Sequence, residues 1–446
     1  MIQVTEEKEA YRSHFADLKR AKERAEPAWL HSLRETAMTS FEKLGFPTVH
    51  DEEWRFTNVA PIAKRTFKTA AAVSPKFPLK KIQPWILGQW KSHRLVFVNG
   101  VFSAELSALE SLPSGVILGS LSQALNTHAG LVEPHLARQT SFEKDSFSAL
   151  NTAFLHDGAF IYIPRWVVLE KPIHILYLTA TDAQESPVSH PRSLIIAESS
   201  SQVQILESYA GFGNGVYFTN AVAEVVAGEN ARVEYYKFQR ESLEAFHISS
   251  FQAQLSRDAN VSNFSISLGA ALARNNVNVV LNGEGAEATL NGFYLVNGSQ
   301  HVDNHTCIDH AKPHCSSFEL YKGILDGKAR AVFSGRIIVR QDAQKTDSKQ
   351  TNKNLILSEE ALVNTNPQLE IYADDVKCTH GATIGQLDAD SIFYLRSRGI
   401  DYDSARHLLT YAFASELNNR INIEPLRAEL ESILFTRLAE GRKIKG

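Results

Sequence analysis

The sequence predicts a mainly β protein in which a long central run of strands lies between a helical beginning and a helical end. Between residues 159 and 395, β-branched and alternating segments follow one another with little helical periodicity. Near both ends of the chain, apolar side chains recur instead at helical spacing. The length of 446 residues exceeds what one compact core usually holds, so about two to four units are expected.

We expect four regions along the chain. These are an N-terminal helical domain (1–75), a mixed α/β connecting region (76–158), a β core (159–395) and a C-terminal helical domain (396–446). The clearest N-terminal element is an amphipathic helix that begins at Pro27 and is stopped by Gly45 and Pro47. In the connecting region, the pattern predicts a strand at 95–98 and a helix at 121–125.

The β core is best described by a parallel β-helix. Its strands include 203–207, 231–236, 277–281, 331–339 and 369–372. Several follow a turn that ends in alanine, at Ala231, Ala286, Ala329 and Ala361, and these alanines are 55, 43 and 32 residues apart. A sandwich or barrel would show turns about every 8–12 residues, so recurring turns at wider, uneven spacing favour the β-helix.

Two amphipathic helices are predicted after the β core. Asp403 is placed to cap the first helix, and Pro425 opens the second, which ends before Gly441. Their apolar stripes are wide enough to need a partner surface. The two helices can satisfy this need by packing on each other, or one face is left for another subunit.

Composition and charge exclude several classes of protein. A net charge of -4 with scattered Lys and Arg argues against binding to nucleic acid or to a membrane surface. The first residues lack a basic and apolar leader, and no run of eighteen apolar residues occurs, so we expect a cytoplasmic protein. Only three cysteines are present, Cys307, Cys315 and Cys378, and we expect them to be reduced.

The familiar enzyme motifs are absent or incomplete. Segment 323–329 (GILDGKA) resembles a phosphate loop but has three residues between its glycines and lacks the following Ser or Thr. The glycine cluster 211–215 lacks the strand and helix context of a dinucleotide site, and no Gly-x-Ser-x-Gly elbow occurs. We therefore do not expect an enzyme.

Segment 371–383 (IYADDVKCTHGAT) contains the most informative residue pair. If it is a strand, Cys378 and His380 point to the same face, about 7 Å apart at the backbone. A thiol beside an imidazole suits iron, zinc or an iron–sulfur cluster, but two ligands make only half of a site. From spacing alone, a buried thiol beside a hydrogen-bonded histidine is the favoured interpretation, and a metal site is the alternative.

A second group of ligand-type residues lies in segment 301–315. Alternation places His301, Asp303, His305, Cys307 and Asp309 on one face of a strand, and His310, His314 and Cys315 follow. Their spacing matches no standard zinc finger, and ligands along one strand do not close a tetrahedron. The favoured interpretation is that these polar residues fill the interior and rim of a β-helix, with a metal site as the alternative.

Three segments closely resemble the SufB/SufD family of iron–sulfur cluster assembly proteins: 343–358 (AQKTDSKQTNKNLILS), 370–383 (EIYADDVKCTHGAT) and 393–399 (FYLRSRG). Segment 53–57 (EWRFT) is similar to the N-terminal signature of that family, and 301–315 to its mid-chain stretch. The SufD branch fits better, because Gly381 stands where SufB proteins usually carry Glu, and no cysteine precedes Cys307.

The resemblance implies a right-handed parallel β-helix flanked by two helical domains and a scaffold role. It implies that the C-terminal helical domain binds the ATPase SufC, that the β-helix pairs with SufB, and that the isolated chain can form a homodimer. Cys378 and His380 match positions that take part in iron entry and nascent cluster assembly, with His380 the stronger candidate. No cofactor is expected to be tightly bound by this chain alone, whereas iron or a transient iron–sulfur cluster is expected in the complex. Flavin binding in the complex is left open.

Two alternatives to the scaffold remain at this stage. A β-helix enzyme acting on carbohydrate would need acidic residues along a groove, and Asp303, Asp309, Asp342 and Asp347 are available. The other alternative is a purely structural partner of SufC in which no residue ligates metal.

Overall fold

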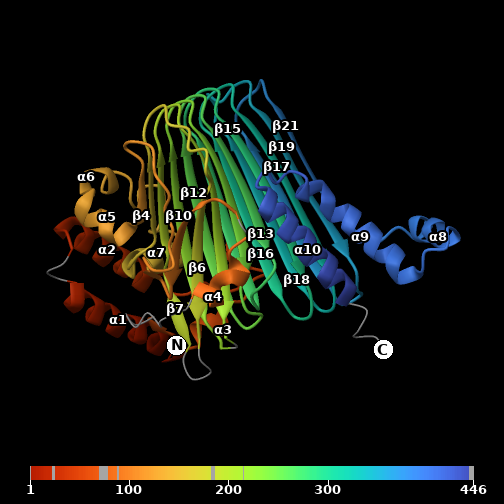
Figure 1. Ribbon diagram of the computed structural model, residues 1–446, viewed down its shortest axis with the longest axis horizontal. Coiled ribbons are helices and arrows are strands. Elements are labelled where there is room, and N and C mark those ends of the chain that lie inside the picture. The colour runs from red at the N-terminus through yellow and green to blue at the C-terminus, as the bar shows by residue number, and fades with distance from the viewer. Residues whose placement is uncertain are drawn as a thin grey trace.

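A computed structural model describes residues 2–22, 26–69, 79–87, 90–181, 186–213 and 215–440. Two long β-sheets form the middle of the molecule, with one helical region at each side (Figure 1). The boundary expected at residue 75, and Gly441 as the end of the last helix, lie outside the described residues.

Successive strands alternate between the two sheets, which we call sheet A and sheet B. Sheet A contains β4 (Ile117–Ser120), β5 (Ala159–Ile163), β8 (Arg192–Ala197), β10 (Phe218–Ala227), β12 (Phe246–Leu255), β14 (Leu272–Leu281), β16 (His301–His310), β18 (Arg330–Val339) and β20 (Leu362–Ile371), joined by β1 (Lys68–Thr69) and β7 (Pro187–Ser189). Sheet B contains β2 (His93–Val98), β3 (Val101–Phe102), β6 (Ile173–Ala180), β9 (Gln202–Phe212), β11 (Arg232–Arg240), β13 (Asn260–Ser267), β15 (Glu287–Val296), β17 (Ser316–Leu325), β19 (Asp347–Ile356) and β21 (Lys377–Gly385).

The strands of each sheet are paired in parallel and in register from β5 and β6 onward. Leu272 of β14 aligns with His301 of β16, and His301 aligns with Arg330 of β18. One turn of the chain is therefore two strands, one in each sheet, which confirms the predicted parallel β-helix. The stack also takes in β2 from the connecting region, because β2 pairs in parallel with β6.

The turns explain the uneven alanine spacing in the sequence. Ala231 and Ala286 precede strands of sheet B, whereas Ala329 and Ala361 precede strands of sheet A, so the four turns belong to two different corners of the β-helix. All four alanine side chains are buried in the interior.

One corner repeats a left-handed residue from turn to turn. Asn230, Asp258 and His314 have φ values of 57°, 56° and 60°. The Asn230 and Asp258 amides each donate to a carbonyl of the next turn, at 2.9 Å. Asn and Asp tolerate this conformation better than most residues, which is one reason for polar corners in the sequence.

The N-terminal region covers part of the outer face of sheet A. The helices on this side are α1 (Ile2–Lys22), α2 (Ala28–Leu44), η1 (Glu52–Trp54), α3 (Ala60–Ala63), α5 (Leu121–Thr127), α6 (Ala129–Val132) and α7 (Ser146–Ala153). Helices α4 (Leu79–Ile82) and η2 (Gln83–Trp85) lie against sheet B instead, where Ile82 packs with Val96 and Leu176. Phe41 of α2 and Phe147 of α7 belong to one cluster with Phe218 and Leu272, which face outward from sheet A. The predicted helix from Pro27 to Gly45 is confirmed, with Pro27 as N-cap and Gly45 as C-cap at φ 68°.

Up to residue 440, where the described part of the chain ends, three helices follow β21: α8 (Ala389–Ser397), α9 (Tyr402–Asn418) and α10 (Glu424–Glu440). The cap of α9 is Asp401 and not the expected Asp403, because the Asp401 side chain accepts the Ser404 amide. Leu417, Leu430 and Leu434 bury their side chains against the outer face of sheet B. The apolar stripes therefore pack on the β-helix, in addition to contacts between α9 and α10.

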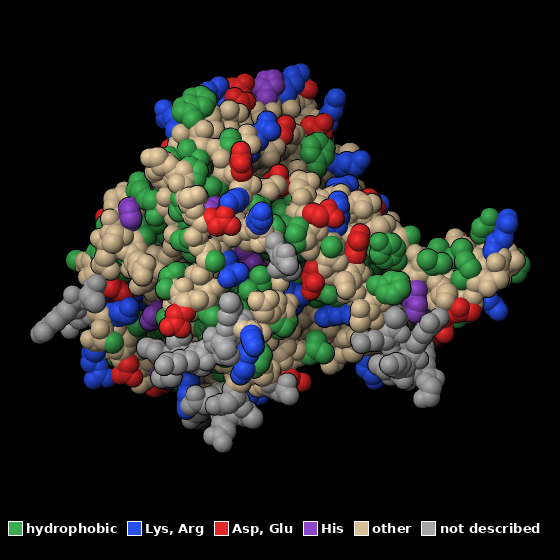
Figure 2. All heavy atoms as spheres, in the orientation of Figure 1, with side chains coloured by type: hydrophobic (Ala, Val, Ile, Leu, Met, Phe, Trp, Pro, Cys, Tyr) green, Lys and Arg blue, Asp and Glu red, His purple; other side chains and the backbone are tan. Residues whose placement is uncertain are grey.

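Helix α8 projects away from the β-helix (Figure 1). None of its residues is buried, and Phe393 and Tyr394 are 72% and 58% exposed. Hydrophobic side chains are visible along this arm in Figure 2. Among the helices described, none combines the length and apolar character needed to cross a membrane.

Candidate functional site

Cys378 and His380 lie on the last strand of sheet B and point to the same side, as alternation predicts. Cys378 aligns with Ser348 of β19, and His380 aligns with Gln350. Ser348 and Gln350 are buried inside the β-helix. Cys378 and His380 therefore continue two inward-facing columns of side chains, but at the end of the stack, where the interior meets solvent.

The two candidate ligands differ in exposure. His380 is exposed, whereas Cys378 is half-buried in a small apolar cluster with Ile337, Val339 and Ala373. Burial raises the pKa of the Cys378 thiol, and the Asp347 carboxylate raises this pKa further. The thiol therefore keeps its proton at neutral pH unless a metal or another cation stabilises the thiolate.

The last turn presents inward-facing apolar side chains to solvent. Ile371 of β20 and Ile384 of β21 are 40% and 47% exposed, although both continue buried columns of the interior. Each of the two strands is at the edge of its sheet, so one row of backbone hydrogen-bonding groups is free to pair. At the opposite end, Phe102 and Leu112 pack against the interior. The β-helix thus has one covered end and one open end.

The row predicted on one face of β16 is present, but it lies beneath the N-terminal region. The Thr57 hydroxyl donates to Asp303 Oδ2 at 2.6 Å and lies 2.9 Å from His301 Nε2. The two ring nitrogens of His305 lie 3.0 Å from Glu53 Oε2 and 3.0 Å from Asp303 Oδ1. Segment 53–57 of the N-terminal region therefore holds His301, Asp303 and His305 of the β-helix through contacts that join these two regions.

The rest of the 301–315 stretch is spread over different faces. His310 points inward and its Nε2 lies 2.9 Å from the Ser317 hydroxyl, while His314 stands at a corner. The Cys315 thiol donates to the Gly283 carbonyl at 3.2 Å. Within the described residues, no three His, Cys, Asp or Glu side chains surround a common metal position. Metal ligation by His301, His305, Cys307, His310, His314 or Cys315 stays a prediction.

The acidic residues considered for a carbohydrate enzyme do not converge. Asp303 is buried in an ion pair with Arg274 at 2.6 Å, and Asp309 pairs with Arg340 at 2.6 Å. Asp347 belongs to the other sheet, on β19. Two of the four acids are thus neutralised by arginine, and the set spans two sheets.

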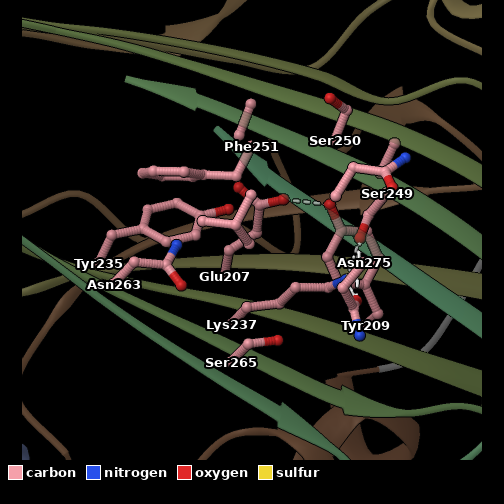
Figure 3. Close-up of a pocket in the computed structure, with 14 residues that line it drawn as sticks. Glu207, Tyr209, Tyr235, Lys237, Ser249, Ser250, Phe251, Asn263, Ser265 and Asn275 are labelled. Atoms are coloured by element: carbon pink, nitrogen blue, oxygen red, sulfur yellow. Dashed lines mark hydrogen bonds between the residues drawn. The ribbon is translucent and has the colours of Figure 1, made fainter. Parts of the chain in front are cut away.

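A polar cluster inside the β-helix was missed by the sequence analysis (Figure 3). Lys237 is buried, and its ammonium donates to Asn275 Oδ1 at 2.5 Å and to the Ser249 hydroxyl. Burial lowers the pKa of Lys237 to about 7. The nearby Glu207 carboxyl, which accepts from Tyr209 and Ser193, has a pKa raised by burial. The sequence pattern that would have indicated this cluster is the alternation Val233, Tyr235, Lys237, which places a lysine on an otherwise apolar face of a strand.

Fold and site together define a β-helix scaffold whose open end presents an exposed imidazole and a shielded thiol. The N-terminal region of SufBD proteins matches residues 5–175, and the SufBD core domain of the SUF iron–sulfur cluster assembly system matches residues 178–413. The chain therefore belongs to the SufBD family of iron–sulfur cluster assembly proteins, which confirms the resemblance.

Individual relatives agree with the family match over most of the chain. A SufBD family protein of Synechocystis is 37% identical over 92% of this chain and 92% of its own length. The SufD protein of Escherichia coli is 31% identical, with 90% and 91% covered. SufD of Bacillus subtilis is 28% identical, with 92% and 94% covered. Relatives named SufD agree with the SufD branch favoured by Gly381.

Proposed function

We propose that this chain is a scaffold subunit of a SUF complex whose open end contributes His380, assisted by Cys378, to iron entry and nascent cluster assembly. The observation that carries the proposal is the exposure of His380 beside a half-buried thiol on an edge strand. Imidazole and thiol suit iron, which is here the cargo of the complex. A SufB-type paralogue, paired through β20 and β21, would supply the remaining ligands.

The chemistry of the two side chains favours transient binding. A neutral imidazole binds iron more weakly than a thiolate does, so a site led by His380 suits a cluster that must leave. Cys378 must lose its proton to bind, and its raised pKa makes this step less favourable. Partner thiolates and incoming sulfide would then dominate the coordination.

The C-terminal helices are proposed to bind a SufC-type ATPase. Glu416 of α9 pairs with Lys322 of β17 at 2.7 Å, and β17 lies two strands from β21 in sheet B. Movement of ATPase subunits bound at α8 to α10 would therefore act on the same sheet that carries His380. Such movement would open or close the pairing with the paralogue.

The test is anaerobic reconstitution with iron and sulfide in the presence of SufB and SufC, followed by absorption spectroscopy. His380→Ala should lower the cluster yield several-fold while the complex still assembles. Thr379→Ala changes the neighbouring exposed residue, which points to the other side of β21, and should leave the yield unchanged. A normal yield from His380→Ala would favour the purely structural partner instead.

A further inference from the structure

A buried carboxyl lies directly beneath His380 in the interior of the β-helix. Glu319 of β17 aligns with Gln350 of β19, and Gln350 aligns with His380 of β21. Neighbouring strands are about 4.8 Å apart, so the Glu319 backbone lies about 10 Å below that of His380. Glu319 and Gln350 are buried, and His380 is exposed. The column therefore runs from a buried acid to the solvent-facing end.

The two inner members of this column are fixed by specific contacts. The Gln350 side-chain amide donates to Glu319 Oε2 at 2.8 Å. Across the interior, Gly335 leaves room for that amide, because a Cβ at this position would lie 2.3 Å from Gln350 Nε2. Gly335 aligns with Thr306, whose hydroxyl lowers the pKa of the Glu319 carboxyl. Gln350 thus lies between the acid and the last turn.

Among the described residues, no salt bridge to Glu319 is found, whereas two other buried acids, Glu224 and Glu241, have ion-pair partners. Glu224 pairs with Arg192 at 2.7 Å, and Glu241 pairs with His247 at 2.7 Å. Burial raises the pKa of Glu319 to about 7, opposed by the Gln350 amide and the Thr306 hydroxyl. No charged group is among these causes, and Tyr321 on the same strand is a neutral neighbour. Glu319 is therefore poised to exchange its proton near neutral pH.

We propose that Glu319 is the charge-compensating acid of the open end, and that it releases its proton when a cation binds at His380. The O–H bond of the carboxyl breaks, its electron pair stays on the carboxylate, and the proton passes to solvent at the open end. Gln350 is a positioning residue that holds the carboxyl in the column. This inference rests on the proposed function, in which His380 is the place where the cation binds.

The expected size of the coupling follows from Coulomb's law. A unit positive charge about 10 Å away, at an effective dielectric constant of about 20, lowers a carboxyl pKa by about one unit. Screening at the exposed His380 position reduces this change to about half a unit. A divalent cation would act about twice as strongly as a single charge.

The coupling can be tested without any metal. His380→Arg places a permanent cation at the open end, since arginine stays protonated, and His380→Gln is the uncharged comparison. Infrared difference spectroscopy over a pH series follows the C=O stretch of the protonated carboxyl, assigned by its loss in Glu319→Gln. The pKa of Glu319 should be lower by about half a unit or more in His380→Arg than in His380→Gln.

A matched control is Thr379→Arg, which adds the same charge to the outward side of β21 and should have a smaller effect. Equal Glu319 pKa values in the two His380 variants, or a carboxyl that does not titrate, would overturn the inference.

The reconstitution test separates this inference from the proposed function. If His380→Ala lowers cluster yield but His380→Arg leaves the Glu319 pKa unchanged, only the coupling fails. If His380→Ala gives a normal cluster yield but the Glu319 pKa still falls in His380→Arg, the proposed function fails and the coupling stands.

Discussion

At the scale of the residue, Lys237 shows how the interior changes ordinary chemistry. Its charged form is disfavoured by burial, so the folded pKa is about 7 while an unfolded lysine has a pKa of about 10.4. Between these values the unfolded chain binds more protons than the folded one. The free energy of unfolding should therefore rise with pH in this range, by up to about 1.4 kcal/mol per pH unit from this residue alone.

Lys237→Met should remove this contribution. The stability of the variant relative to wild type should be highest at and below about pH 7 and should fall as the pH rises toward about 10, because wild type loses its penalty over that range. Denaturant unfolding of both proteins across the range measures the difference. Lys349→Met, an exposed lysine of β19, controls for the loss of one positive charge. A difference that does not vary with pH would contradict the burial effect.

Single residues were predictable where only the strand period mattered. Alternation placed Cys378 and His380 on one side of β21, and the row from His301 to Asp309 on one face of β16. It did not place Gln350 beside Glu319, because those residues are 31 positions apart and meet only through the register of the β-helix. The cover of segment 53–57 over His305 likewise depends on a contact across 252 positions.

At the scale of the element, helices were recognised from apolar spacing, but their surroundings were not. The stripes that carry Leu417 on α9 and Leu430 and Leu434 on α10 pack on sheet B. The same helices also carry exposed apolar residues, including Phe435. Spacing alone cannot tell which apolar residue of a wide stripe meets a partner within the chain and which is left for another subunit.

Leu430→Ala should loosen the attachment of α10 to sheet B. Leu430 is 1% exposed, and truncation of a buried leucine costs about 2–5 kcal/mol. Hydrogen exchange should therefore accelerate in α9 and α10, while the strands around Lys237 remain protected. Phe435→Ala on the same helix, where the side chain is 76% exposed, should change exchange little. Equal effects from the two substitutions would show that α10 is not held by its buried stripe.

At the scale of the whole molecule, the β-helix was predictable and its asymmetry was not. Long strands with uneven turns indicated a solenoid, because each turn needs only its neighbours to bury its apolar side. Which end is covered depends on where the N-terminal region and helices α9 and α10 fold back. Helices α9 and α10 pack along the side of sheet B and α8 projects away, so the last turn remains open although helices follow it in the chain.

The open end should be the surface through which this chain pairs with a second β-helix. Ile384 is 47% exposed on edge strand β21, and burying such a side chain contributes about 1.5–3 kcal/mol. Ile384→Lys replaces this gain by a desolvation cost, so the affinity for a SufB-type paralogue should fall by about tenfold or more. Mass photometry of the mixed subunits measures the complex. Val168→Lys, where the native side chain is 52% exposed on an early turn, should pair normally. Unchanged pairing by Ile384→Lys, with an unaltered fold, would move the interface away from the last turn and leave His380 without a partner to complete its coordination.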